Sequence, residues 1–284
     1  MEKYLQLKNN SKMPRLGMGT WYLGEDNRTR EAEIKALQAG VEAGAELIDT
    51  AEMYGGGRAE RLVGEALPKY NRKKLFLVSK VYPHNAGRNQ IFDSIKNSLD
   101  NLRTDYLDLY LLHWRGSIPL AETVECMEEL VREGRIKNWG VSNFDTDDMK
   151  ELFTVPGGEN CAVNQVLYHL GSRGIEYDLM PWLEEHEIPV MAYCPLAQAG
   201  ALQQGLLKSR ILLEIAAKYQ ITVMQLLLAF VLNHDNVTAI PRSKSADHVL
   251  ENMAVRDLKL EADDYEAMNR TFPAPASKTY LDIV

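Results

Sequence analysis

Short apolar runs of strand length alternate with amphipathic helical segments along most of the chain. The apolar runs are residues 16–19, 46–49, 75–80, 106–113, 136–142, 161–165, 189–194 and 237–240. Between them, apolar residues recur every three or four positions, as at Leu120, Val124, Met127 and Leu130. Because strands that are apolar throughout are typical of a parallel sheet covered by helices, eight such repeats favour a closed (β/α)8 TIM barrel. A six-stranded doubly wound sheet is the alternative.

Further segments lie before and after these repeats. Residues 4–7 and 13–16 flank a run of polar, turn-forming residues, which predicts an N-terminal β-hairpin that covers one barrel end as a lid. Asp145 and Ser245 are predicted to cap helices that begin at residues 146 and 246. An extra C-terminal helix and a tail are expected after the last repeat. Since a barrel of this kind needs about 250 residues, we expect residues 1–284 to form one domain.

Composition and charge limit which binding partners and which cellular location are expected. The chain is 45% hydrophobic and carries a net charge of −8 without an extended Lys/Arg-rich run, so neither nucleic acid nor an anionic membrane is an expected partner. Cys126, Cys161 and Cys194 lie far apart without ligand spacing, so no disulfide framework and no metal site is expected. The opening residues lack a signal-peptide pattern, and the longest apolar stretch is far shorter than the ~20 residues that cross a bilayer. A cytoplasmic location is expected.

Polar residues lie at the carboxyl ends of the predicted strands, where barrels of this kind place their active sites. They are Asp49, Lys80, His113, Ser142, Asn143, Asn164, Gln165, Tyr193, Arg242 and Ser243. Any one of them could instead cap the next helix or be a satisfied core residue. Their convergence on one rim nevertheless indicates a site.

Lys80 ends an apolar run, and a buried ammonium without a partner is costly. Asp49 is the obvious partner. A salt bridge that merely closes the barrel is one interpretation of this pair. The functional interpretation adds Tyr54, because a neighbouring ammonium lowers the pKa of a phenol from its usual value of about 10. Tyr54 would then donate a proton near neutral pH.

The segment Leu47-Ile48-Asp49-Thr50-Ala51-Glu52-Met53-Tyr54-Gly55, followed by Glu60 and Gly64, closely resembles the signature of the aldo-keto reductases. The resemblance extends over nearly the entire chain, through Gly17-Met18-Gly19-Thr20-Trp21, Val78-Ser79-Lys80, His113-Trp114, Gly140-Val141-Ser142-Asn143-Phe144, Asn164-Gln165, Ala192-Tyr193-Cys194-Pro195-Leu196 and Ile240-Pro241-Arg242-Ser243. Around residues 165–178 the chain is most similar to the short bacterial branch that includes methylglyoxal reductases.

This resemblance implies an oxidoreductase that uses NADPH to reduce small aldehydes and ketones, such as methylglyoxal or keto-sugars, to alcohols. By the same resemblance, Tyr54 is the general acid, Lys80 lowers its pKa, Asp49 anchors Lys80, and His113 orients the carbonyl. Hydride would come from nicotinamide C4 while Tyr54 protonates the developing alkoxide. No metal is required, and a monomer is expected.

The resemblance also assigns a cofactor site. Tyr193 stacks on the nicotinamide, while Ser142, Asn143 and Gln165 hold its carboxamide. The 2′-phosphate is surrounded by Arg242, Ser243, Ser245 and His248, at a helix start whose free N–H groups attract anions. The remaining assigned positions are Glu251 and Asn252 at the adenine, together with Gly19, Thr20, Asp49, Cys194, Pro195, Leu196 and Ile240.

Some residues depart from the family pattern. Relatives commonly place Lys and Arg near the 2′-phosphate, where this chain has Arg242 and His248, so NADH is expected to bind as well, with lower affinity. Residues 197–201 lack the Ser and Asp that clasp the pyrophosphate in relatives, and faster cofactor exchange is expected. The tail of residues 276–284 is shorter than in many relatives, so we expect an open, permissive substrate mouth.

Aromatic residues that follow the strands are expected to line that mouth. They are Trp21, Tyr22, Tyr82 and Trp114, which join Tyr54 and His113 in the expected substrate site. Two other functions fit the same residues. In a Schiff-base aldolase or lyase, Lys80 would attack a carbonyl, although Asp49 argues against this by holding the ammonium charged. A nucleotide-binding barrel without chemistry is the second alternative.

Overall fold

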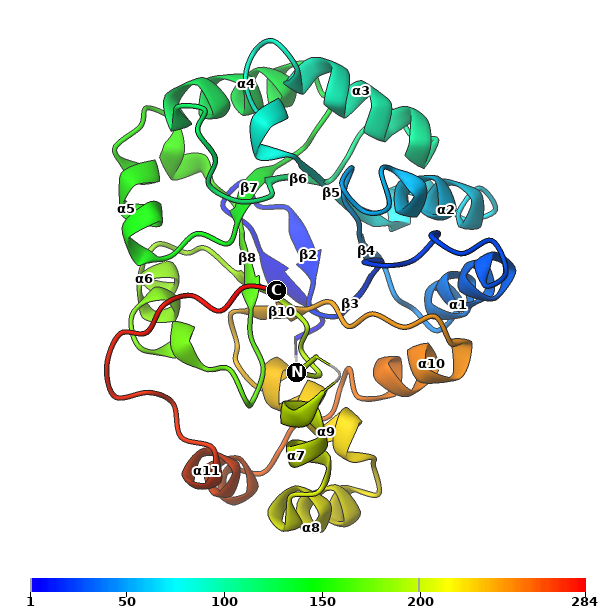
Figure 1. Cartoon of the computed structure of the whole chain (residues 1–284), viewed down its shortest axis with the longest axis vertical. Coiled ribbons are helices and arrows are strands. Elements are labelled where there is room, and N and C mark those ends of the chain that lie inside the picture. Colours follow the sequence, from blue (N-terminus) through cyan, green and yellow to red (C-terminus); the bar gives the residue numbers. More distant parts are fainter. Residues whose placement is uncertain (1, 199) are drawn as a thin grey trace.

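The computed structural model describes residues 2–198 and 200–284. Its centre is a sheet of eight parallel strands in sequence order, surrounded by helices (Figure 1). The strands are β3 (Gly17–Gly19), β4 (Leu47–Asp49), β5 (Phe76–Val81), β6 (Leu109–Leu112), β7 (Trp139–Ser142), β8 (Asn164–Leu167), β9 (Val190–Tyr193) and β10 (Val237–Ala239). The bridges of Leu16 to Ala239 and of Gly19 to Arg242 close the first strand against the last. The predicted (β/α)8 barrel is confirmed, and the doubly wound alternative is wrong.

The helices pack their apolar faces against the outside of the barrel. They are α1 (Arg30–Glu42), α2 (Arg58–Ala66), α3 (Ile91–Leu102), α4 (Leu120–Arg132), α5 (Thr146–Phe153), α6 (Leu179–Glu185), α7 (Ala201–Leu207), α8 (Arg210–Tyr219), α9 (Val223–Leu232), α10 (Ala246–Ala254) and α11 (Ala262–Thr271). No single helix among the described residues is long and apolar enough to cross a membrane, and only α8 and α9 taken together, bent by 84°, pass that test. Helix α11 is the predicted extra C-terminal helix.

Alternate residues of each strand enter different cores. Ile48 and Leu77 face the helices and belong to the larger core, whereas Leu47, Phe76 and Val78 belong to a smaller core inside the barrel. This alternation follows from the two-residue period of a strand. Both faces of the sheet are therefore apolar, as the continuous apolar runs predicted.

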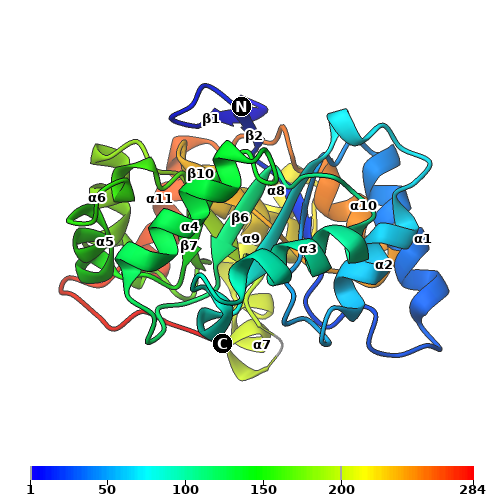
Figure 2. The same ribbon diagram turned by 90° about the horizontal axis from the view of Figure 1, so that it is seen from above.

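The amino end of the barrel is covered by a hairpin of β1 (Tyr4–Gln6) and β2 (Lys12–Pro14). Leu7 and Met13 of this hairpin are fully buried and pack into the core inside the barrel. Figure 2 shows the hairpin and the C-terminus on opposite faces of the molecule. The predicted lid is confirmed, and it lies away from the end at which the strands finish.

Arg15 closes the seam between the first and the last strand. Its buried guanidinium donates to the carbonyl oxygens of Leu232 (2.7 Å), Val237 (3.3 Å) and His234. The backbone N–H of Ala239 donates in turn to the carbonyl of Arg15 at 2.9 Å. The seam thus joins residues more than two hundred positions apart.

Some element boundaries and caps differ from the prediction. Strand β6 begins at Leu109 rather than at 106, and β8 begins at Asn164 rather than at 161, because the residues before them lack regular ladder pairing. Asp145 forms the predicted cap, with its side chain accepting from the N–H groups of Asp147 and Asp148. Ser245 occupies the cap position of α10 without a side-chain cap bond, and Ser243 Oγ accepts from the Ser245 N–H instead. The predicted side-chain cap at Ser245 is therefore wrong.

Candidate active site

A cavity of about 570 Å³ lies at the carboxyl ends of the strands. Many of the residues predicted for a site line it, although they come from distant parts of the sequence. The lining residues are Gly19, Thr20, Trp21, Asp49, Met53, Tyr54, His113, Trp114, Arg115, Ser142, Asn143, Gln165, Tyr193, Cys194, Ile240, Arg242, Ile283 and Val284. The expected convergence of strand ends on one rim is therefore present in the fold.

Lys80 lies fully buried beneath this cavity and uses all the donors of its ammonium. Its Nζ is 2.8 Å from both carboxylate oxygens of Asp49 and 2.8 Å from the carbonyl oxygen of Thr50. It also donates to the phenolic oxygen of Tyr54 at 3.2 Å. A barrel-closing salt bridge would not require this last contact, which connects the ion pair to a side chain on the cavity wall.

Burial dominates the electrostatics of this group. It lowers the pKa of Lys80 and raises that of Asp49, while the attraction between the two opposes both shifts. Burial also raises the pKa of Tyr54 well above its ordinary value, and the Asp49 carboxylate adds to the increase. The predicted lowering of the Tyr54 pKa is therefore wrong, chiefly because the phenol is fully buried and also because the Asp49 carboxylate disfavours a second negative charge beside it. Tyr54 therefore keeps its proton throughout the neutral range.

His113 stands across the cavity wall from Tyr54, with the two rings 5.7 Å apart in an edge-to-face arrangement. Burial, aided by the charge of Lys80, lowers the pKa of His113 to about 3. The imidazole is neutral at physiological pH and carries one N–H. Its Nδ1 is buried and has no hydrogen-bond partner among residues 2–198 and 200–284.

A chain of amide and hydroxyl groups joins the catalytic candidates to the opposite wall. Asn143 accepts a hydrogen bond from the Tyr193 hydroxyl at 2.8 Å and donates to the carbonyl of His113 at 3.2 Å. Gln165 donates to Asp49 at 2.8 Å, and Ser142 donates to the Gln165 carbonyl at 2.8 Å. Asn143 adopts a left-handed backbone with φ of 57°, a conformation that asparagine tolerates better than most residues. These contacts fix the side chains that were predicted to hold the nicotinamide.

The predicted phosphate site lies at one edge of the cavity, and only part of it lines the wall. Arg242 lines the cavity, and its Nε donates to the Trp21 carbonyl at 2.8 Å. The remaining predicted residues do not line the cavity. Ser243 and Ser245 lie on the loop before α10, and Pro195 and Leu196 follow β9. The residues on α10 itself are His248, Glu251 and Asn252. Sequence analysis missed Lys244, an exposed second cation in the same loop. Because Ser243 and Ser245 were both assigned to the 2′-phosphate, the position of Lys244 between them could have indicated that it lies near the phosphate as well.

Two of the four aromatic residues predicted for the substrate mouth line the cavity. Trp21 and Trp114 do so, whereas Tyr22 is 54% exposed and stacks on Trp21 with ring centroids 4.5 Å apart. Tyr82 packs edge-on against Trp114 at 5.7 Å from outside the cavity. Tyr22 and Tyr82 thus each pack against a tryptophan that lines the cavity, and their own contact with a substrate stays a prediction.

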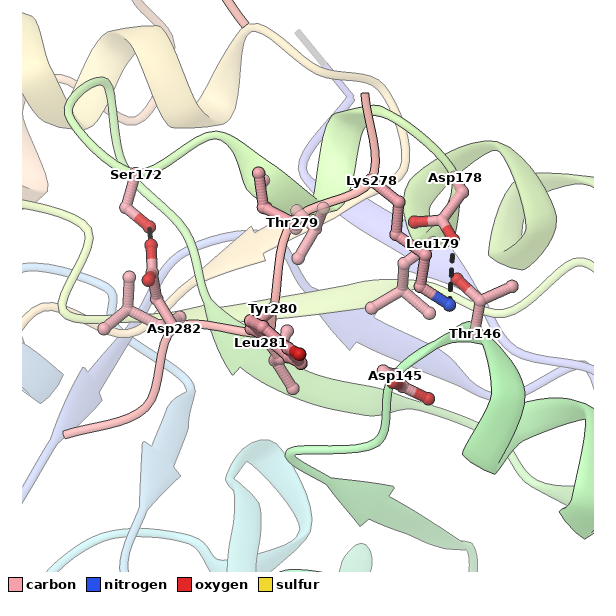
Figure 3. A pocket seen from close by; sticks show the side chains of 13 residues that line it. Asp145, Thr146, Ser172, Asp178, Leu179, Lys278, Thr279, Tyr280, Leu281 and Asp282 are labelled. Carbon is pink, nitrogen blue, oxygen red and sulfur yellow. Dashed lines mark hydrogen bonds and ion pairs between the residues drawn. The ribbon is translucent and has the colours of Figure 1, made fainter. Parts of the chain in front are cut away.

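The C-terminal tail reaches the cavity, so the expected open mouth is also wrong. Lys278 pairs with Asp147 at 2.8 Å, and the Ser172 hydroxyl donates to the carboxylate of Asp282. Figure 3 shows a separate pocket that the tail forms with residues of β8, α5 and α6, with the Ser172–Asp282 contact at one end and the ion pair of Lys278 with Asp178 at the other. Residues Ile283 and Val284 then form part of the cavity wall. Sequence analysis missed them, as it missed Met53 and Arg115.

Among the described residues, no group of three or more His, Cys, Asp or Glu side chains could hold a metal ion. The arrangement instead offers a neutral proton donor, a buried ammonium behind it and a neutral imidazole beside it. Such a set can stabilise negative charge that develops on a carbonyl oxygen.

Comparisons with known proteins agree with this geometry. The model of the aldo/keto reductase family matches residues 15–271. The methylglyoxal reductase YeaE of Escherichia coli K12 is 53% identical over 283 residues, which cover 100% of this chain and 99% of that protein. The methylglyoxal reductase DkgB of Escherichia coli O157:H7 is 30% identical, over 90% of this chain and 92% of that protein.

Solved structures that resemble this chain are also aldo/keto reductases. An aldo/keto reductase from Klebsiella pneumoniae, in complex with NADP and acetate, is 51% identical, has a TM-score of 0.97 and is matched over 100% of both chains. The aldose reductase from Schistosoma japonicum is 28% identical, with a TM-score of 0.81 over 95% of this chain and 92% of that chain.

Proposed function

The chain belongs to the aldo/keto reductase family, and from that premise we propose that it uses NADPH to reduce small aldehydes and ketones to alcohols. The observation that carries this proposal is the contact of Lys80 with both Asp49 and Tyr54 below a cavity. We assign Tyr54 as the proton donor, Lys80 and Asp49 as the pair behind it, and His113 as the residue that orients the carbonyl.

The residues present fit NADPH. The ring of Tyr193 and the polar groups of Asn143 and Gln165 lie on one wall of the cavity, where a nicotinamide and its carboxamide would be held. Arg242 lies at the cavity edge towards α10, whose first turn lacks a side-chain cap from Ser245. Uncapped N–H groups at a helix start attract a phosphate. When bound, the cofactor supplies the hydride.

The side chains supply and stabilise the proton transfer. As the carbonyl carbon is reduced, Tyr54 gives its proton to the carbonyl oxygen, and the phenolate that forms accepts a hydrogen bond from Lys80. The raised pKa of Tyr54 keeps the proton in place until that moment. Neutral His113 donates its N–H to the same oxygen and so holds the carbonyl beside Tyr54.

Methylglyoxal is the leading candidate substrate, because the relative that is 53% identical is a methylglyoxal reductase. The cavity wall supports a small substrate, since Trp21, Trp114 and Ile283 narrow it with apolar surface. Keto-sugars and other small aldehydes are the further candidates. We also propose that the whole chain is one domain, because the barrel is closed by strands of one chain. That the protein acts as a monomer stays a proposal that rests on the family resemblance.

Purified protein with NADPH and a panel of methylglyoxal, aromatic aldehydes, aldoses and keto-sugars tests this function. We expect loss of NADPH absorbance with the first two classes and little with aldoses. Borohydride trapping tests the aldolase alternative, which is disfavoured because Lys80 is fully buried and donates to three neighbours. Trapping of a substrate on Lys80, without NADPH oxidation by any carbonyl, would reject the proposal.

A further inference from the structure

A second large hollow lies at the opposite end of the barrel from the active-site cavity. This groove, of about 570 Å³, runs between the N-terminal hairpin and the amino ends of β5 and β7. Its walls carry the side chains of Lys12, Lys73, Lys74 and Lys137. Its size is within the range of roughly 300–1,000 Å³ that small-molecule sites occupy. We refer to it as the hairpin groove.

The carboxylates of the hairpin groove pair with only one of these four lysines, Lys137. Asp108 pairs with both Lys137 and Arg72, at 2.8 Å in each case. Glu46 is held by Lys3 at 2.5 Å. Elsewhere among residues 2–198 and 200–284, no carboxylate or other hydrogen-bond acceptor contacts the ammonium groups of Lys12, Lys73 or Lys74.

The sign of this local charge is opposite to that of the whole protein. With their partners counted, the two carboxylates Glu46 and Asp108 face six cations, Lys3, Lys12, Arg72, Lys73, Lys74 and Lys137, an excess of four positive charges. The chain as a whole carries −8. Because a concave surface of one sign focuses the electrostatic potential, the groove attracts anions that the rest of the surface repels.

The kind of cation indicates which anion fits. Arg72 lies next to the groove but does not line it, and its donors are already used by Thr104, by the carbonyls of Leu75 and Tyr106, and by Asp108. Ammonium groups act as compact point charges that bind phosphates without the paired geometry of a guanidinium, so they favour a compact anion of high charge. The groups left without partners are ammonium groups.

We propose that the hairpin groove is a binding site for a small anion with two or more phosphates, separate from the active site. Lys12 contacts it from the hairpin, and Lys73 and Lys74 contact it from the turn before β5. Sequence analysis gave no sign of this site, because Lys12, residues 72–74 and Lys137 are far apart in the chain and come together only in the folded barrel.

Calorimetric titration with tripolyphosphate tests the proposal on the full chain. The protein is first saturated with NADP⁺, so that the active-site cavity does not bind the probe, and ionic strength is held constant. We expect one site, which Lys12→Gln and Lys73→Gln each weaken by about 5- to 20-fold, the effect of removing one charged contact. Citrate, with three carboxylates, should bind at least 10-fold more weakly than tripolyphosphate.

Two control variants locate the site. Lys208→Gln removes an exposed lysine after α7, far from the groove, and should leave the affinity unchanged. Arg242→Ala alters the edge of the active-site cavity and should also leave it unchanged. Absence of tripolyphosphate binding, an equal loss in Lys208→Gln, or a loss in Arg242→Ala alone would overturn the proposal. Equal affinity for citrate would overturn the assignment to phosphates.

Discussion

The ammonium nitrogen of Lys80 lies 3.2 Å from the phenolic oxygen of Tyr54 and 2.8 Å from the carboxylate of Asp49. One buried cation therefore touches both the proposed proton donor and the group that balances its charge. The contact with Tyr54 gains strength when the phenol loses its proton, which is the moment of reduction. Each member of this group can be removed separately, with a distinct expected result.

Tyr54→Phe removes the proton donor and keeps most of the ring packing. We expect turnover with methylglyoxal to fall by roughly 10²–10⁴, the usual scale of general acid catalysis. NADPH affinity should change little. Single-turnover kinetics measure the rate of reduction, and fluorescence titration measures the NADPH affinity. Near-normal turnover under conditions where chemistry limits the rate would mean that another group supplies the proton.

Lys80→Met leaves the Asp49 carboxylate buried without its partner, so stability should fall by about 3–5 kcal/mol and turnover should fall as well. The double variant Lys80→Met/Asp49→Leu is the matched control, because it removes the unpaired charge. It should recover much of the stability and none of the turnover. Chemical denaturation measures the stability of each variant, and steady-state kinetics measure its turnover. A double variant with restored turnover would show that the pair only closes the barrel.

His113 links stability to pH through its lowered pKa. The folded protein keeps this imidazole neutral down to about pH 3, whereas the unfolded chain takes up a proton near pH 6.5. Its contribution is therefore fully present above about pH 6.5 and is lost as pH falls towards 3, at about 1.4 kcal/mol for each pH unit. We expect His113→Asn to flatten this acid decline in urea-unfolding experiments. The exposed His84→Gln variant should retain it.

Arg242→Ala should weaken NADPH binding by roughly 10- to 100-fold and NADH binding far less, because only NADPH carries the 2′-phosphate. Lys244→Ala should also weaken NADPH binding more than NADH binding. The loss of NADPH affinity should be smaller than in Arg242→Ala, since a single ammonium lacks the paired donors of arginine. The ratio of the two dissociation constants is the quantity to measure. A loss shared equally by NADPH and NADH would show that this loop does not recognise the phosphate.

Ile283→Ala tests the tail as part of the substrate wall. We expect kcat/KM for methylglyoxal, relative to that for an aromatic aldehyde, to fall by roughly 3- to 10-fold, a small effect because Ile283 is exposed and only one face of it borders the cavity. Tyr280→Ala is the control, since that side chain is 97% exposed and belongs to the same tail. An unchanged ratio in Ile283→Ala would exclude the tail from substrate selection.

Sequence alone predicted the barrel and most of the residues that line its cavity. Strand period and strand-end position predicted the barrel and the polar residues of its rim, because in a closed parallel barrel every strand brings its carboxyl end to the same rim. The resemblance to the aldo-keto reductases supplied other lining residues, such as Gly19, Thr20 and Cys194. Residues 161–163 are apolar like a strand, yet β8 begins only at Asn164, because ladder pairing and not apolar character defines where a strand begins.

The electrostatics of the site and the path of the tail were beyond sequence reasoning. Proximity of Lys80 to Tyr54 suggested a lowered pKa, but the sign depends on how completely Tyr54 is buried and on the position of Asp49. The tail is short, yet its anchors at Asp147 and Ser172 carry it across the mouth. Both results depend on distances between segments that lie far apart in the chain.

The seam at Arg15 has a consequence for how the protein acquires its fold. Because Arg15 bonds to carbonyls at Leu232, His234 and Val237, the seam between the first and the last strand cannot close until about four fifths of the polypeptide has left the ribosome. Contacts of such high sequence separation slow folding, since a long loop must close before they form. During synthesis the early βα units therefore present an unsealed sheet edge. A nascent chain of this kind is the form most exposed to aggregation, and the form for which a chaperone would matter most.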